Sequence, residues 1–153
     1  MKNKIVLGLL LGLVIFLFWG IGLSKINNSN IEFDWVKVLK VVDGDTIKVE
    51  ISDKTESVRL IGIDAPELSD SSTKGLKAIE AKDFLIDLIG DGKVRLEADE
   101  TQDDKDVYDR LLRYVFLENG KMVNEEMIKE KMAEEYTFIV PYKYQKLFKD
   151  LEK

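Results

Sequence analysis

Charged side chains of the kinds that bind cations and phosphate gather in two short runs of the chain. The runs are VVDGDTIKV at residues 41–49 and VRLIGIDAPE at residues 58–67, and their candidate groups are Asp43, Asp45, Arg59, Asp64 and Glu67. Carboxylates held close together repel one another unless one takes up a proton or a hard cation lies between them. An arginine beside such a cation suits phosphate, because its planar guanidinium donates a fork of hydrogen bonds. The two runs therefore predict one site for a cation and a phosphate-bearing substrate.

Two residue types that often carry out hydrolysis are missing. The 153 residues contain no cysteine and no histidine. This excludes disulfides, cysteine-rich zinc sites, thiol nucleophiles and every mechanism that relies on an imidazole. Among common hydrolytic designs, carboxylate, metal and arginine chemistry remains.

The net charge argues against a general nucleic-acid binder. Lys2 and Lys4 are the only charged residues before Lys25, so of the chain's net −6 the remainder carries 21 basic and 29 acidic residues, a net charge of −8. Nucleic-acid binders usually present a basic patch. A polyanion would therefore be held through a local positive spot and a bound cation.

The N-terminus carries an apolar segment. Ile5 to Leu23 contains no charged residue and has about the length that a helix needs to cross a bilayer. Because lysines precede it, residues 1–24 are predicted to be a membrane anchor with its N-terminus in the cytoplasm, followed by a polar linker at 25–32 and a domain at 33–153. A cleaved signal peptide is the alternative, although no A-x-A-like site follows the segment. A buried core helix is disfavoured because the segment has no polar face.

The rest of the chain predicts an α+β domain. Strands are expected at Phe33–Val42, Thr46–Ile51, Val58–Ile63, Lys93–Ala98 and Leu111–Leu117. Helices are expected at Ser72–Ile89, after a cap at Asn124, and from Pro141 onward. The acidic run Asp99–Asp106 is predicted to be an exposed loop.

The parity of the third strand raises a difficulty. Arg59 and Asp64 differ by an odd number of positions, so in a regular strand they would face opposite sides of the sheet. For both to reach one site the backbone must bend, and Gly62 is the expected place. The Asp-Gly-Asp turn at 43–45, taken alone, is best explained as a tight hairpin, and only the second run favours a site.

With these motifs the chain resembles the thermonucleases, the staphylococcal-nuclease-like domains. The resemblance rests on VDGDT and VRLIGIDAPE, on YDRLLRYVFL at residues 108–117 and on NGKMVNEEMI at residues 119–128, in matching order and spacing. It covers roughly residues 35–151. The resemblance implies a five-stranded barrel of the oligonucleotide-binding type capped by about three helices, and a nuclease activity.

The resemblance also implies which residues hold the metal. Asp45 and Asp64 match the two metal carboxylates, and the backbone carbonyl of Ala65 matches a third ligand at a position where the family often has threonine. The implied ion is calcium, which suits a flexible set of oxygen ligands.

The remaining roles fall on three residues. Glu67 matches the group usually assigned as general base, with a helix cap as the alternative role. Arg59 and Arg110 match the two phosphate-binding arginines, which act mainly where negative charge grows in the transition state. Asp109 replaces a glycine before Arg110 and could pair with it, in which case Arg113 could take over part of the phosphate contact.

The resulting expectation is a calcium-dependent nuclease that cuts DNA and RNA, preferably single-stranded, with little sequence preference, and leaves 3′-phosphate ends. Aromatic residues in Tyr136–Tyr144 are expected either to stack on a base or to pack in the core. We expect a monomer without a protein partner, anchored outside the cytoplasm or secreted. The alternatives are a non-catalytic binding module of the same barrel fold and a structural envelope protein.

Overall fold

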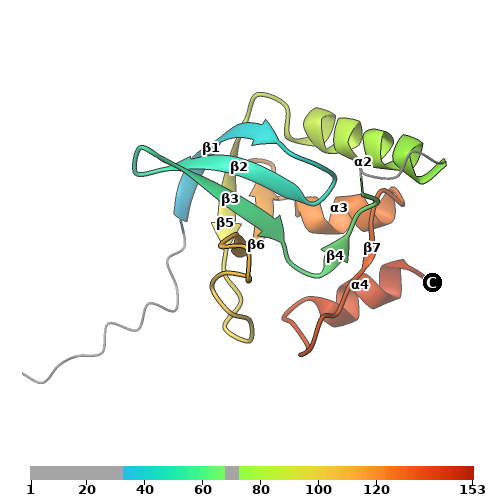
Figure 1. Cartoon of the computed structure of the whole chain (residues 1–153). Helices are drawn as coiled ribbons and strands as arrows, with labels where there is room; N and C mark the ends of the chain where they lie inside the picture. Colours follow the sequence, from blue (N-terminus) through green and yellow to red (C-terminus); the bar gives the residue numbers. More distant parts are fainter. Residues whose placement is uncertain (1–32, 68–72) are drawn as a thin grey trace, which may run out of the picture.

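The computed structural model describes residues 33–67 and 73–153. Its elements are β1 (Phe33–Val41), β2 (Thr46–Ile51), β3 (Lys54–Leu60), β4 (Ile63–Asp64), α2 (Thr73–Ile89), β5 (Lys93–Glu97), β6 (Leu111–Leu117), α3 (Val123–Lys129), β7 (Glu134–Glu135) and α4 (Gln145–Leu151). Strands β1, β2, β3, β6 and β5 close into a barrel in that order, and β4 pairs with β7. Figure 1 shows the helices of the described residues gathered at one end of this barrel. The predicted helix-capped barrel is confirmed.

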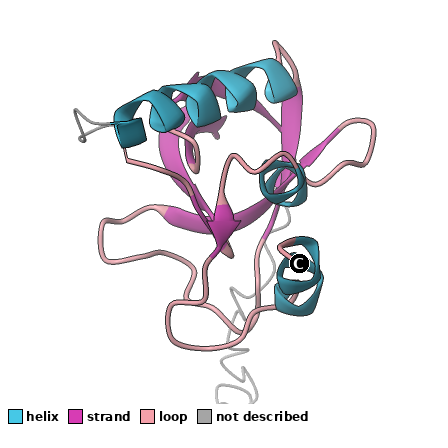
Figure 2. Ribbon diagram, turned by 90° about the vertical axis from the view of Figure 1, so that its right-hand side faces the viewer, coloured by secondary structure: helices cyan, strands magenta, loops and turns pink. Residues whose placement is uncertain are grey.

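The strands of the barrel wall contain alternating apolar and polar residues. From Ile47 to Glu50 in β2 buried and exposed positions alternate, and at the end of β3 the buried Val58 and Leu60 flank the half-buried Arg59. The two strands pair without interruption from Thr46↔Arg59 to Ile51↔Lys54. Strand β6 lies antiparallel to β5 and parallel to β3, which closes the ring seen in Figure 2. The apolar side chains of the strands therefore point into a shared interior.

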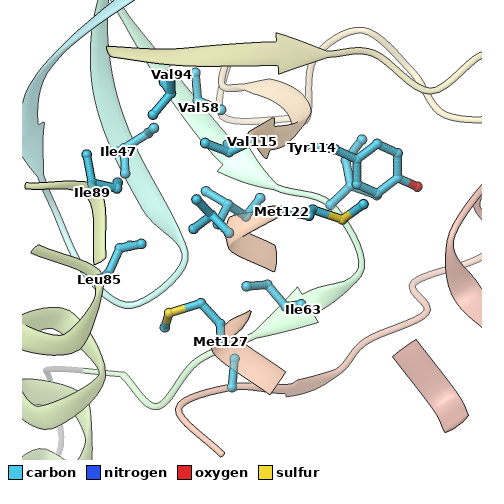
Figure 3. Packing of buried hydrophobic residues seen from close by; sticks show 14 of the residues in the cluster. Ile47, Val58, Ile63, Leu85, Ile89, Val94, Tyr114, Val115, Met122 and Met127 are labelled. Carbon is cyan, nitrogen blue, oxygen red and sulfur yellow. The ribbon is translucent and has the colours of Figure 1, made fainter. Parts of the chain in front are cut away.

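Helices α2 and α3 close the interior at one end. In Figure 3 strand residues such as Ile47, Val58 and Val115 point toward Leu85 of α2 and Met127 of α3. All of these side chains are fully buried. The helices therefore pack against the turns and strand ends at that end of the barrel, where β4 also lies.

The third strand differs from its predicted bounds because the turn before it is shorter. Ser52 and Asp53 both have positive φ, 50° and 62°, and form a tight two-residue connection, so pairing with β2 resumes at Lys54. Such turns match the twist of the flanking strands. The polar stretch 54–57, predicted to be part of the turn, is therefore strand. Strand β3 ends at Leu60, and Gly62 follows with φ +79°, which confirms the irregular backbone expected there.

Asn124 does not cap α3, as its type and position had predicted. The helix begins at Val123, and the Asn124 side chain is buried. Its Oδ1 accepts from the Val115 N–H over 3.0 Å, and its Nδ2 donates to the Ile61 carbonyl over 2.9 Å. Asn124 thus links β6 to the segment that follows β3, a long-range use that outweighs its local preference for a cap.

Two further local predictions were wrong. The last helix begins at Gln145 rather than Pro141, because residues 142–145 form a turn in which the Gln145 N–H donates to the Tyr142 carbonyl over 3.1 Å. The acidic run Asp99–Asp106 is not uniformly exposed, since Asp99 is buried. Hydrogen bonds from the Tyr114 hydroxyl and the Lys143 N–H, over 2.6 and 2.7 Å, compensate that burial.

The predicted anchor at Ile5–Leu23 and the linker at 25–32 lie outside the described residues. Among the helices of residues 33–67 and 73–153, none has the length and apolar character needed to span a bilayer.

Candidate active site

The turn between β1 and β2 fixes Asp45 through its backbone. The Asp45 N–H donates to Asp43 Oδ1 over 3.1 Å, and the Asp45 carbonyl accepts from the Leu60 N–H over 2.9 Å. Gly44 has no room for a side chain: a Cβ there would lie 2.6 Å from the Cβ of Ala65 and 2.9 Å from that of Ala81. Glycine is therefore needed for close approach, and the turn is packed against α2 and the segment after β4.

Arg59 joins the two predicted metal carboxylates. Its Nη2 lies 3.1 Å from Asp45 Oδ2 and 3.0 Å from Asp64 Oδ1. Its Nη1 donates to the carbonyls of Leu60 and Ile63 over 2.8 and 2.7 Å, which holds the guanidinium in place. The bend at Gly62 thus brings Arg59 and Asp64 together, as the parity argument required.

Asp45 is a buried carboxylate whose charge is poorly compensated. Its Oδ2 accepts from the Ala65 N–H over 3.0 Å, and its Oδ1 accepts from Thr46 Oγ1 over 3.0 Å. Burial raises the pKa of Asp45, Arg59 and these two donors lower it, Asp43 raises it, and the result is a pKa of about 6. A cation beside Asp45 would remove much of the cost of keeping this group ionised near neutral pH.

The donor set fits one hard cation between two carboxylates. Asp45 Oδ2 and Asp64 Oδ1 both contact Arg59 Nη2, so the two oxygens lie close enough together to share one cation, and the Arg59 guanidinium takes that place in the structure. Oxygen-only ligation of this kind suits calcium, with water completing the shell. Across residues 33–67 and 73–153 no three His, Cys, Asp or Glu residues lie close enough to form a metal cage. Glu67 is exposed and is not part of such a group, and the roles predicted for Glu67 and for the Ala65 carbonyl stay predictions.

The second predicted arginine reaches the same site from the loop before β6. Arg110 Nε donates to Asp106 Oδ2 over 2.7 Å, and Arg110 Nη1 lies 3.4 Å from Thr46 Oγ1. Since Thr46 also donates to Asp45, polar contacts run from Arg110 through Thr46 and Asp45 to Arg59. The structure therefore brings Arg59, Arg110, Asp45 and Asp64 together.

Sequence reasoning missed two of these residues. Thr46 lies between Arg110 and Asp45, and Asp106 accepts from both the Nε and the backbone N–H of Arg110. The spacing of Asp106 and Arg110 by four residues was a signal that could have found the second, because it is the spacing of many local ion pairs. For Thr46 no local signal existed, since its partner is 64 positions away.

The pairing of Asp109 with Arg110 that the sequence left open is not present in the structure. Asp109 Oδ1 contacts Lys105 Nζ over 2.9 Å, and Asp106 is the acidic partner of Arg110. Asp109 has a φ of 64°, a backbone conformation that glycine adopts without strain. Arg113 is buried, and its Nη2 contacts Asp104. Arg113 is therefore a structural cation rather than a substitute for Arg110.

The aromatic residues divide into two groups. Tyr142 and Tyr144 pack against Phe148, with ring centroids 5.7 and 6.4 Å away. Phe138 is 75% exposed and Tyr108, whose ring lies 5.3 Å from the Arg110 guanidinium, is 77% exposed. Packing therefore accounts for the first pair, whereas Tyr108 is available beside an arginine of the site.

Comparison with known proteins relates the sequence to nucleases. The family model described as "Staphylococcal nuclease homologue" matches residues 57–153. A thermonuclease of Staphylococcus hyicus is 37% identical over 89% of this chain and 76% of its own length, and one of Staphylococcus intermedius is 32% identical over 97% of this chain and 89% of its own. Endonuclease YncB of Bacillus subtilis is 38% identical over 61% of this chain and 44% of its own length.

Proposed function

The chain belongs to the staphylococcal nuclease family, and from this premise we propose that it is a calcium-dependent nuclease that hydrolyses phosphodiester bonds of DNA and RNA. The observation that carries the proposal is the polar chain Arg110–Thr46–Asp45–Arg59–Asp64, which joins two arginines and two carboxylates at one end of the barrel. The named activities of the relatives support the same reaction class.

In this proposal Asp45, Asp64 and the Ala65 carbonyl hold the calcium ion. When bound, the ion would supply positive charge beside the phosphate oxygens of the substrate. The Asp64 side chain is 58% exposed and that of Asp45 only 10%, so Asp64 is the member of the pair that solvent and substrate can reach.

Arg59 and Arg110 are the proposed phosphate ligands. Both guanidiniums are held by acceptors of the chain itself, the Leu60 and Ile63 carbonyls for Arg59 and Asp106 for Arg110. Such preorganised donors stabilise the charge that grows on the phosphate oxygens as the phosphorus becomes five-coordinate. Their position is thus set before substrate arrives, which is what transition-state stabilisation requires.

Glu67 is the proposed general base that takes a proton from the attacking water. The water oxygen forms a bond to phosphorus while the bond from phosphorus to the 5′-oxygen breaks; the 5′-oxygen takes up a proton from solvent and leaves as a hydroxyl, and the other product carries a 3′-phosphate end. Tyr108, exposed beside Arg110, offers a stacking surface for one base, which favours single strands with unpaired bases. Recognition through phosphate and one stacked base gives little sequence preference.

The remaining proposals concern the setting of the enzyme. An apolar N-terminal segment would anchor the domain outside the cytoplasm, or direct its secretion if cleaved, where calcium is plentiful enough for weak carboxylate sites. We propose a monomer. The competing function is a binding module of the same fold, and the retained arginines and carboxylates favour the enzyme.

One experiment separates the enzyme from the binding module. The detergent-solubilised full chain is incubated with single-stranded DNA in calcium and then in excess chelator, beside Asp45→Asn and, as a matched control, Asp91→Asn on an exposed turn. Calcium-dependent cutting that Asp45→Asn abolishes and Asp91→Asn retains supports the proposal, and mass spectrometry of the products identifies the ends. Binding of DNA without cutting in either condition would contradict it.

A further inference from the structure

One outer face of the barrel combines lysines with large apolar side chains. It is formed by strands β5, β1 and β2, and we call it the lysine face; its residues are Trp35, Lys37, Leu39, Lys40, Lys48 and Lys93, all exposed. Trp35 and Leu39 are each 43% exposed although both are large and apolar. The grouping forms a local positive area on a chain whose net charge is −6.

Strand register places the lysines beside one another. Lys37 of β1 pairs with Lys93 of β5, and Lys40 of β1 pairs with Lys48 of β2. Residues opposite each other on antiparallel strands point to the same side, with Cβ atoms about 5 Å apart. The register shifts between Val38 and Lys40, so Leu39 and Lys40 are both exposed.

The lysines of this face form no salt bridges with the described residues. No ion pair recorded within residues 33–67 and 73–153 involves Lys37, Lys40, Lys48 or Lys93. Glu50 is exposed and lies opposite Lys37 on β2, so it offsets part of the positive charge. Like charges opposite each other destabilise a sheet, so the face carries a cost that an external anion would relieve.

The side chains of the lysine face suit a partner whose surface is anionic and whose layer beneath that surface is apolar. Lysines are attracted to anionic phospholipid headgroups, tryptophan prefers the boundary between headgroups and acyl chains, and an exposed leucine gains by leaving water. Phosphodiester strands would satisfy the lysines but would leave Leu39 exposed. The observations therefore favour a phospholipid bilayer.

The position of the face in the chain favours the same occupant. The apolar segment Ile5–Leu23 is followed by residues 25–32, which fully extended reach about 27 Å, before β1 begins. Trp35 and Lys37 thus lie in the first strand after the proposed anchor. The turn that carries Asp45 follows the opposite end of β1, toward the helices in Figure 1.

We propose that the lysine face docks on the surface of an anionic phospholipid bilayer and holds the domain there. The proposal rests on the anchor suggested above for the N-terminal segment. It does not depend on nuclease activity, because the lysine face shares no residue with the site.

Trp35 reports directly on docking. The chain has two tryptophans, Trp19 in the N-terminal segment and Trp35, so a Trp19→Phe chain has Trp35 as its single tryptophan, which is excited selectively at wavelengths where tyrosine does not absorb. This chain is reconstituted into phosphatidylcholine vesicles, with or without phosphatidylglycerol, that contain lipid brominated near the headgroup, and the vesicles are recovered by flotation. We expect quenching of Trp35 fluorescence in phosphatidylglycerol vesicles, little quenching in phosphatidylcholine alone, and reversal by high salt.

Two charge-matched variants locate the contact. Lys37→Gln with Lys93→Gln is expected to weaken docking by about fivefold for each lysine removed, and Lys77→Gln with Lys149→Gln, on exposed positions of other elements, is expected to leave it unchanged. Thermal melting checks that both variants are folded. Cleavage of a short single strand in detergent, expected to be equal in both, reports the nuclease proposal separately.

Several results would overturn the docking proposal. These are a chain that does not float with vesicles, an unquenched Trp35 in phosphatidylglycerol vesicles, or equal losses in the two lysine variants. Slower cutting of long single strands by the Lys37→Gln, Lys93→Gln variant, with quenching retained, would instead assign the face to nucleic acid.

Discussion

Asp45 and Asp99 are buried to nearly the same extent, 7% and 6% exposed, yet their pKa values move in opposite directions. For Asp99 burial acts to raise the pKa, but hydrogen bonds from the Lys143 N–H, the Tyr114 hydroxyl and Thr101 outweigh it and lower the pKa. For Asp45 burial prevails over Arg59 and the Ala65 N–H, and the pKa rises to about 6. Equal exposure to solvent therefore does not fix the charge of a carboxylate: desolvation of the Asp45 carboxyl prevails over its donors, whereas the donors of Asp99 prevail over its desolvation.

The donors of the two aspartates differ in number and in length. Asp99 accepts four hydrogen bonds of 2.6 to 2.9 Å, two of them from Thr101. Asp45 has contacts of 3.0 to 3.1 Å to Ala65, Thr46 and Arg59, with Asp43 close by. Asp99 is thus a satisfied structural group, whereas Asp45 has longer contacts and is the carboxylate beside which we propose a bound cation.

The largest effect is expected at Arg59, the cation that Asp45 has and Asp99 lacks. Arg59→Gln removes a proposed phosphate ligand together with the ion pairs to Asp45 and Asp64. Turnover on single-stranded DNA should fall by a factor on the order of 10²–10³. Arg95→Gln, the same charge change on β5, is the control and should keep its turnover. A loss of less than tenfold for Arg59→Gln would show that the arginine only positions the carboxylates.

Neutral substitutions should separate the two aspartates by stability. Asp99→Asn leaves buried donors without an acceptor and should lower the free energy of unfolding by about 1–3 kcal/mol. Turnover per folded molecule should stay unchanged. Chemical denaturation and active-site titration measure the two quantities.

The corresponding substitution Asp45→Asn should not lower the free energy of unfolding, in contrast to Asp99→Asn. Because the pKa of Asp45 lies about two units above its ordinary value of 3.8, ionised Asp45 costs the metal-free protein up to about 3 kcal/mol at neutral pH. Asp45→Asn without calcium should therefore unfold at equal or higher denaturant concentration than the unmodified chain while losing calcium binding. A marked destabilisation would mean that Asp45 is as well satisfied as Asp99.

The pH dependence of stability should show opposite slopes for the two groups. A carboxyl whose folded pKa is raised binds more protons when folded, so the Asp45 contribution to stability falls as pH rises from about 4 to about 7. The Asp99 contribution is present above the unfolded pKa of about 3.8 and is lost as pH falls through its lower folded pKa. Unfolding free energies of the calcium-free chain, Asp45→Asn and Asp99→Asn, measured against pH, give both slopes by subtraction. Equal slopes would remove the distinction between the two aspartates.

Much of the fold and the core of the site followed from the sequence because they depend on local pattern. The bounds of β2 and β6 match their predicted ranges, and the parity of Arg59 and Asp64 located the bend at Gly62. Contacts between distant parts of the chain could not be read in this way. Asn124 had a strong local preference for a cap, and only the folded barrel supplies the Val115 and Ile61 groups that it binds instead.

The acidic loop shows the same limit at three aspartates. A run of carboxylates predicts exposure, and the sequence does not indicate which one turns inward to Tyr114 or which contacts a buried arginine. Asp99, Asp104 and Asp106 are each held by a different partner, respectively Tyr114, Arg113 and Arg110. The sequence indicated that Asp109 could pair with Arg110, but Asp109 contacts Lys105 instead.

Substitution of Asp109 should have the smallest effect on stability and turnover, and it serves as a reference for the larger effects expected at the other aspartates. Its side chain is 85% exposed and its φ of 64° suits glycine, so Asp109→Gly exchanges a weak surface ion pair for an unstrained backbone. The free energy of unfolding should change by less than about 1 kcal/mol, and turnover should stay within twofold because Arg110 keeps its Asp106 partner. Asp106→Asn is the matched comparison, with an expected loss of turnover, since it removes the charge that holds the Arg110 guanidinium. If Asp109→Gly raised turnover strongly, Asp109 would compete for Arg110 in solution, and charge near the site would matter more than the donors that distinguish Asp45 from Asp99.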